Sequence, residues 1–116
     1  METTPPPPPK EEEPTIHEAE RASGPSGAVE WGSELGETAA VERRKKGLDI
    51  VVRGENRKRN RARARQIETA VGTPITEDAA HARAGPLALP HFHQTSRDPD
   101  GHTFYETAGV KARRKR

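Results

Sequence analysis

The apolar residues of this chain fall into a few short runs that long polar stretches separate. The run from Leu48 to Val52 holds three β-branched residues in five positions, which predicts a buried strand closed by Gly54. The next segment, Glu55 to Val71, is rich in helix-favouring residues, and Gly72 and Pro74 follow it. Its apolar residues form one modest helical stripe, which consists of Ala64, Ile67, Ala70 and Val71. The pattern therefore predicts a strand followed by a long helix.

Two shorter helices are expected on either side of this pair. The first runs from Val41 to Lys46, and Gly47 ends it. The second begins at Thr73-Pro74, with proline in the first turn, or at Thr76-Glu77-Asp78, with a threonine cap followed by acids. Gly85-Pro86 would end that second helix, and His81 would lie on its surface.

The segment from Pro90 to Glu106 has two short aromatic and β-branched runs, LPHFHQT and HTFYET, around the residues Ser96 to Gly101. Asp, Pro and Gly favour a turn because proline presets φ, aspartate bonds the nearby backbone and glycine accepts a positive φ. The pattern predicts a β-hairpin with a longer loop. His91 and His93 share one face of its first strand, because side chains alternate, and Phe92 lies on the other face.

Two registers of this hairpin remain open, and they differ in what the histidines face. In the first register Thr95 lies opposite His102. The pairs that result are His93 with Phe104, His91 with Glu106 and, on the other face, Phe92 with Tyr105. That register gathers three histidines and a carboxylate. In the second register Phe92 lies opposite Phe104, and the first strand's histidines share a surface with Thr103 and Tyr105.

Composition sets the expected extent of the fold. Hydrophobic residues make up 29% and charged residues 33% of the 116 residues, which is closer to disordered than to ordinary globular chains. Residues 1–40 contain a proline run and then a Gly-, Ser- and Glu-rich stretch, so we expect a disordered acidic linker there. Trp31 is expected to pack on the domain, with exposure as the alternative. Residues 41–116 are expected to form an α+β domain, with one or two short helices packed on a small antiparallel sheet and the hairpin at its C-terminal end.

Charge is divided unevenly along the chain. The net charge is +2, but residues 1–40 carry nine acidic and two basic residues, and the remainder carries eighteen basic and nine acidic residues. A segregated basic half favours a polyanionic partner, most often nucleic acid. The sequence has no cysteine, no apolar run near the ~20 residues that cross a bilayer and no signal-peptide core. Disulfide and thiolate chemistry are therefore excluded.

The predicted long helix carries a dense group of cations in its N-terminal half. These are Arg57, Lys58, Arg59, Arg61, Arg63 and Arg65, and only Glu55 lies near them in sequence to offset their charge. We interpret the group as an RNA-binding surface that contacts phosphates, with a solvated charged face as the alternative. A second cationic run, Lys111 to Arg116, has a composition of low specificity.

The candidate catalytic residues gather in the hairpin, and His93 among them is expected to face solvent. They are His91, His93, Arg97, His102, Thr103 and Tyr105. Histidine acts as both acid and base near neutral pH, and a cation can stabilise the charge that builds on phosphorus. RNA supplies its own 2′-hydroxyl nucleophile, so these residue types suffice to cleave a phosphodiester without a metal or another cofactor. The sequence leaves open which histidine is the base.

Other interpretations of the same residues stay open. His91 and His93 on one strand face can supply two zinc ligands, with His102 or Glu106 as a third, although no second ligand set accompanies them. The histidines can also be ordinary surface residues of a hairpin. For the whole chain, the alternatives to an enzyme are a nucleic-acid-binding protein without catalysis and a mainly disordered protein that folds on a partner.

With a Pro-rich spacer, an Arg-rich helix and a terminal hairpin that contains HFH and GHTFYE, the chain resembles the C-terminal toxin modules of bacterial polymorphic toxins. Many of those modules are ribonucleases, and some belong to the class that unites barnase-like, EndoU-like, colicin-like and RelE-like nucleases. The resemblance spans Val41 to Arg116 and implies helices packed on a small antiparallel sheet that bears the site. The chain departs from the class in having fewer clear strands.

The resemblance also implies partners and a place of action. A toxin of this kind is exported as part of a larger protein, acts as a monomer in the cytoplasm of a target cell, and is neutralised by an immunity protein. An acidic immunity protein would match the cationic face of the domain.

Overall fold

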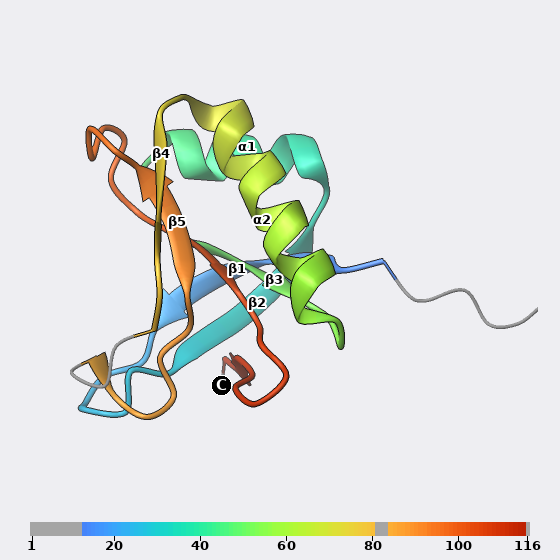
Figure 1. The fold of residues 1–116 in the computed structure, drawn as a ribbon, viewed down its shortest axis with the longest axis vertical. Helices are drawn as coiled ribbons and strands as arrows, with labels where there is room; N and C mark the ends of the chain where they lie inside the picture. The colour runs from blue at the N-terminus through green and yellow to red at the C-terminus, as the bar shows by residue number, and fades with distance from the viewer. Residues whose placement is uncertain (1–12, 81–83, 116) are drawn as a thin grey trace, which may run out of the picture.

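A computed structural model of the chain describes residues 13–80 and 84–115. Within these residues two helices pack on one face of a seven-stranded mixed sheet (Figure 1). The helices are α1 (Glu37–Lys45) and α2 (Arg57–Val71), and the strands are β1 (Thr15–Arg21), β2 (Val29–Leu35), β3 (Ile50–Arg53), β4 (Ile75–Asp78), β5 (His91–Gln94), β6 (Thr103–Tyr105) and β7 (Arg113–Arg114). The order across the sheet is β4-β5-β6-β3-β1-β2-β7. The predicted α+β class is confirmed, but the sheet is not purely antiparallel, because β3 pairs with β6 and β2 with β7 in parallel.

The first two strands lie where the sequence predicts a disordered linker. β1 is an internal strand that pairs antiparallel with β2 on one side and with β3 on the other. Ile16 of β1 is 4% exposed and Val29 of β2 is 1% exposed. The prediction that the fold begins only at Val41 is therefore wrong for residues 13–40, while residues 1–12 lie outside the described part. Each strand buries only a few small apolar side chains among charged ones, so the acidic composition conceals the alternation.

Trp31 of β2 packs on the domain, as expected. It is half-buried, its ring centroid lies 5.0 Å from that of His17, and the guanidinium carbon of Arg53 lies 4.1 Å above it. The cation–π attraction to Arg53 stabilises this packing, in addition to the burial of the ring.

Both predicted helices around the first strand are present, with shifted ends. α1 begins earlier than the predicted Val41, and Gly47 follows it with a φ of +82°, a conformation that favours glycine. α2 begins later than the predicted Glu55, because the side chain of Asn56 caps it by accepting the N–H of Arg59 at 3.0 Å.

The stripe predicted on α2 is only partly buried. Ala64 and Ile67 are fully buried, whereas Ala70 is exposed. Two polar residues, Asn60 and Glu68, complete the buried face of the helix. A search for apolar periodicity misses them because their burial depends on partners in other elements.

A strand replaces the second short helix that the sequence predicts. β4 pairs antiparallel with β5, so that Ile75 lies opposite Gln94 and Asp78 opposite His91. Pairing along β5 outweighs the local signals for a helix start, and the β-branched Ile75 and Thr76 suit a strand. The helix predicted from Thr73-Pro74 or Thr76-Glu77-Asp78 is therefore wrong, and His81 lies outside the described residues.

The predicted hairpin is confirmed, but it adopts neither of the two expected registers. β5 and β6 are antiparallel with His91 opposite Phe104 and Phe92 opposite Thr103. As in the first expected register, the histidines share one face with Phe104, and Phe92 shares the other face with Tyr105. The ring centroids of Phe92 and Tyr105 lie 5.7 Å apart. β6 also pairs in parallel with β3, so a second neighbour sets its position together with the turn.

The sheet separates two hydrophobic clusters. The cluster under the helices includes Ile16, Ile50, Val52, Ile67, Phe92 and Tyr105. The cluster on the opposite face consists of Ala19, Val29, Val51, Leu89, Phe104 and Ala112. In the described part of the chain, coil segments around Leu89 and Ala112 supply the outer part of this second cluster, and neither α1 nor α2 covers it.

A buried ion pair links both helices to the loop of the hairpin. The side chains of Arg44 on α1 and Glu68 on α2 are fully buried, and the guanidinium donates to the carboxylate from Nε at 3.0 Å and from Nη2 at 3.2 Å. Arg44 also donates to the backbone carbonyls of Leu48, Asp100 and Gly101. Gly101 has a φ of +99°, and a β-carbon there would meet Nη1 of Arg44 at 2.5 Å, so this close approach requires glycine.

Glu68 accepts two further hydrogen bonds from the hairpin strands. Nε2 of Gln94 donates at 2.6 Å, and the hydroxyl of Thr103 donates at 2.9 Å. Hydrogen bonds thus surround the buried carboxylate. A buried ion pair needs such additional hydrogen bonds to offset the cost of its desolvation.

We expect Glu68→Gln to destabilise the protein by about 3–5 kcal/mol, because it leaves the Arg44 guanidinium buried without a counter-charge. Urea unfolding followed by circular dichroism measures this loss. Glu37→Gln, which breaks the half-exposed pair of Glu37 with Arg63, is the matched control and should cost less than about 1 kcal/mol. Equal losses in the two variants would contradict the role assigned to the buried pair.

Candidate functional site

Three histidines of the hairpin meet on the face of the sheet opposite the helices. His91 and His93 come from β5, and His102 directly precedes β6. The ring centroids lie 4.6 Å apart for His91 and His102, 6.1 Å apart for His91 and His93, and 6.2 Å apart for His93 and His102. Phe104 packs against His91 with ring centroids 5.3 Å apart and forms the apolar side of the cluster.

Two aspartates contact the histidines. Oδ2 of Asp78, on β4, lies 2.9 Å from Nε2 of His93 and 3.4 Å from Nε2 of His91. Asp49, which precedes β3, accepts the backbone N–H of His102 at 2.7 Å, and its Oδ1 lies 3.4 Å from the ring nitrogen Nδ1. Each carboxylate therefore fixes part of the hairpin relative to a neighbouring strand.

Glu106, the carboxylate expected opposite His91, has other partners. Its side chain is 3% exposed and accepts hydrogen bonds from Nε of Arg53 at 3.1 Å and from the backbone N–H groups of Gly54 and Ala112 at 3.2 and 2.8 Å. Glu106 therefore joins the segment after β6 to the end of β3.

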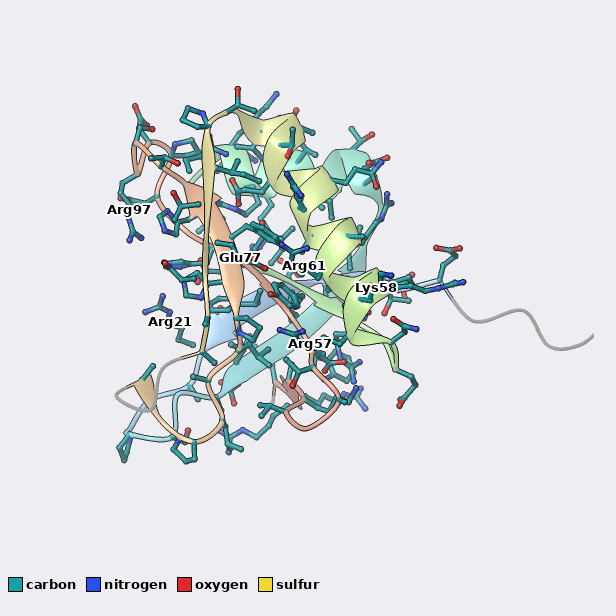
Figure 2. The ribbon with its side chains drawn as sticks, viewed as in Figure 1. Arg21, Arg57, Lys58, Arg61, Glu77 and Arg97 are labelled. Atoms are coloured by element: carbon teal, nitrogen blue, oxygen red, sulfur yellow. The ribbon has the colours of Figure 1, made fainter. Side chains whose placement is uncertain are left out.

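Two arginines are candidates for the cation of the site. Nη2 of Arg21, at the end of β1, lies 3.1 Å from both ring nitrogens of His102, and its guanidinium carbon lies 5.7 Å from the ring centroid of Phe104. Arg97 lies in the exposed loop of the hairpin with a φ of +65°. Figure 2 shows both arginines on the side of β5 that is away from α2.

The environment of the cluster sets the charges of its members. Burial lowers the pKa of His91 to about 4, and the neighbouring His102 adds to the shift, so His91 is neutral at pH 7. Burial acts to raise the pKa of Asp78, but the hydrogen bond from His93 and the surrounding positive charges, Arg97 among them, outweigh burial and lower it. The pKa of Asp49 is lowered in the same way, since its hydrogen bonds with His102 outweigh burial.

His93 is held between two hydrogen-bond acceptors. Its Nδ1 lies 2.8 Å from the carbonyl oxygen of Gln94, and its Nε2 lies 2.9 Å from the carboxylate of Asp78. His93 is 4% exposed, so the expectation that it faces solvent is wrong.

Thr103 and Tyr105 lie on the helix face of the sheet, apart from the histidines with which the sequence analysis grouped them. The hydroxyl of Thr103 donates to Glu68, and the hydroxyl of Tyr105 donates to Glu77 at 2.6 Å. Alternation along β6 separates both from His102, because residues 102 and 104 point to one face and residues 103 and 105 to the other.

The cations of α2 also lie on the helix side of the sheet. Carboxylates from other segments form ion pairs with three of them: Arg59 with Glu13, Arg61 with Glu77, and Arg63 with Glu37. These partners lie outside the helix, so pairing within the helix, for which Glu55 is the nearby acid, is not what offsets the charge. Arg57, Lys58 and Arg65 are exposed on the helix surface.

The sequence analysis did not single out Arg21, Asp49 and Asp78. Arg21 belongs to a strand assigned to the linker and lies 81 positions from its partner His102. Asp78 would have been found if residues 75–78 had been assigned as a strand beside β5, since that pairing puts it opposite His91. No local signal marks Asp49, because its role depends on the parallel pairing of β3 and β6.

Among residues 13–80 and 84–115, no three His, Cys, Asp or Glu side chains are placed to hold one metal ion together. The zinc interpretation of His91 and His93, with His102 or Glu106 as a third ligand, stays a prediction that chelation tests. In the same residues, neither helix has the length and apolar character that crossing a membrane requires.

Comparisons with known proteins give no further assignment of the site. No family model, no curated protein and no solved structure matches this chain.

The low pKa of His91 makes stability depend on pH. An unfolded histidine titrates near pH 6.5, so between about pH 6.5 and pH 4 the unfolded chain binds a proton that the folded chain does not. We expect the free energy of unfolding to fall as the pH drops through this window, and the His91 ring to titrate near pH 4 by NMR. In His91→Gln this part of the pH dependence should vanish, and a native His91 that titrates near pH 6.5 would contradict it.

Proposed function

We propose that the protein is a bacterial toxin domain that cleaves RNA without a metal and uses the histidine cluster as its active site. The observation that best supports this proposal is the meeting of three imidazoles, two aspartates and Arg21 on one face of the sheet. These groups include the acid, the base and the cation that transfer of an RNA phosphodiester requires.

His91 and His102 are the two rings that reach the substrate in this proposal. Their side chains keep 15% and 17% of their surface exposed, whereas that of His93 keeps 5%. Neutral His91 takes the proton of the 2′-hydroxyl as that oxygen attacks phosphorus. His102 acts as the acid and gives a proton to the 5′-oxygen as its bond to phosphorus breaks. The products are a 2′,3′-cyclic phosphate and a 5′-hydroxyl.

The cations stabilise the transition state and adjust the base. Arg21, beside His102, and Arg97, on the loop, counter the negative charge that builds on the phosphoryl oxygens. The negative charge of the bound phosphodiester favours the protonated form of His91. It therefore makes the ring a stronger base and offsets the effect of burial. Asp78 and His93 are positioning residues, since His93 holds the carboxylate that lies 3.4 Å from Nε2 of His91.

RNA and an acidic immunity protein are the partners in this proposal. Exposed Arg57, Lys58 and Arg65 on α2 would raise the local concentration of RNA and attract an acidic inhibitor. As the resemblance to polymorphic toxins implies, the domain would be exported within a larger protein and would act as a monomer in the cytoplasm of a target cell.

A nucleic-acid-binding protein without catalysis is the second candidate. It is favoured by one observation: the cations of α2 and the histidines lie on opposite faces of the sheet. RNA bound along α2 alone would therefore not cross the histidines. Turnover of RNA separates the two candidates, because both bind RNA in a salt-dependent way.

We expect the purified protein to cleave single-stranded RNA in excess EDTA, and His91→Gln to lower the rate by about 10²- to 10⁴-fold through loss of the base. Gel analysis of a labelled oligonucleotide measures the rate and identifies the cyclic phosphate end. Arg21→Gln should also lower the rate, through loss of the cation beside His102. Arg113→Gln is its control, because it removes the same charge from exposed β7. Activity that needs zinc, or full activity in the doubly substituted His91→Ala, His93→Ala protein, would overturn the proposal.

Replacing Lys58 and Arg65 together by Gln should weaken RNA binding and flatten its salt dependence. We expect the slope of log K against log salt to fall in magnitude by roughly 1.4, since each lost phosphate contact with a single strand removes about 0.7. Fluorescence anisotropy across a salt series measures it. An unchanged slope would show that α2 does not contact phosphates.

A further inference from the structure

A pocket on the helix face has no part in the histidine chemistry. It lies between the first turns of α2 and the strands β4 and β6, and its volume is about 330 Å³. Its walls include Arg57, Arg61, Glu77, Pro90 and Tyr105. Figure 2 shows Arg61 of α2 and Glu77 of β4 directed toward each other across the space between these elements.

Glu77 accepts every short hydrogen bond recorded between side chains of this pocket. Arg61 donates to it from Nε at 2.6 Å and from Nη2 at 2.9 Å, and the hydroxyl of Tyr105 donates at 2.6 Å. Three donors therefore converge on one carboxylate, which is the arrangement that proteins also use for the oxygens of a phosphate.

The charges of these groups are settled at neutral pH. The hydrogen bond from Arg61 lowers the pKa of Glu77 despite burial, so the carboxylate is ionised. Burial raises the pKa of Tyr105 to about 12, and its hydrogen bond to Glu77 adds to this, so the phenol keeps its proton and remains a donor.

One positive charge of the pocket is left over. Glu77 balances Arg61, while the exposed Arg57 forms no ion pair within the described part of the chain. An anion that enters beside Arg57 can also take over donors that Glu77 now holds, because the side chain of Glu77 keeps 31% of its surface exposed and can move toward solvent.

We propose that this pocket binds a phosphate group, and that Glu77 is an internal carboxylate that competes with the phosphate for Arg61 and Tyr105. Arg57 attracts the anion, and its planar guanidinium can donate two hydrogen bonds to it. The identification of the phosphate as one from RNA rests on the proposed function, whereas the site itself does not.

Two substitutions with opposite expected effects test the site. In an NMR titration of the full chain with inorganic phosphate at constant ionic strength, the Nε–H signals of Arg57 and Arg61 should shift to saturation. Arg57→Gln should weaken binding about tenfold, since a hydrogen-bonded charge contributes on that scale. Glu77→Gln should tighten it several-fold, because the competing anion is gone.

Matched controls separate a built site from general surface charge. Arg113→Gln on β7 and Glu42→Gln on α1 make the same changes of charge at exposed positions away from the pocket and should leave the affinity for inorganic phosphate unchanged. Equal effects of Arg57→Gln and Arg113→Gln would overturn the proposal. So would a Glu77→Gln protein that folds, by its circular dichroism, and binds phosphate no more tightly. Arg57→Lys keeps the charge but loses the planar pair of donors, so it should weaken binding less than Arg57→Gln does.

Uncleavable DNA oligonucleotides identify the source of the phosphate independently of catalysis, because they lack the 2′-hydroxyl. If Arg57→Gln weakens binding only of the 5′-phosphorylated oligonucleotide, the pocket binds a terminal phosphate. An equal loss with and without that group assigns it to a backbone phosphodiester. No loss with either, in a protein that cleaves RNA, would overturn the assignment to nucleic acid and leave the ribonuclease proposal standing.

Discussion

The buried charge of Glu68 is the constraint on which the hairpin depends. A carboxylate with no exposed surface is tolerable only while Arg44, Gln94 and Thr103 surround it with donors. The same guanidinium binds the carbonyl oxygens of Asp100 and Gly101, which directly precede His102. The position of a ring on one face of the sheet is thus fixed by an ion pair that lies under the helices on the other.

The edge of the sheet formed by β4, β5 and β6 serves two different environments. Neighbouring residues of β4 point to opposite faces, so Asp78 contacts the histidines while Glu77 contacts Arg61 and Tyr105. The same alternation divides β6, where Phe104 lies among the imidazoles and Tyr105 lies under α2. The short strand β4 therefore supplies one carboxylate to each of the two candidate sites, which lie on opposite faces of the sheet.

The sequence predicts the elements that a local pattern of residues determines. The apolar run of β3, the helix-favouring stretch of α2 and the turn residues between β5 and β6 each act within a few positions, and all three elements are present. What could not be predicted depends on distant partners. β1 needs β2 and β3 beside it, the register of the hairpin needs β3, and Arg21 meets His102 only in the finished sheet. The histidines were found because three of them lie in one hairpin, and their aspartates were missed because they come from other strands.

The place of β6 in the sheet has a consequence for the order of assembly. β6 lies between β5 and β3, and it pairs Val51 with Phe104, residues from opposite halves of the chain. During synthesis from the N-terminus, β3 must wait for this neighbour until nearly all of the described residues have left the ribosome. Closing so long a loop is slow compared with forming a helix or a local hairpin. Arg21 and His102 therefore come together only late, and a shorter nascent chain contains the histidines of β5 without the surroundings that set their chemistry.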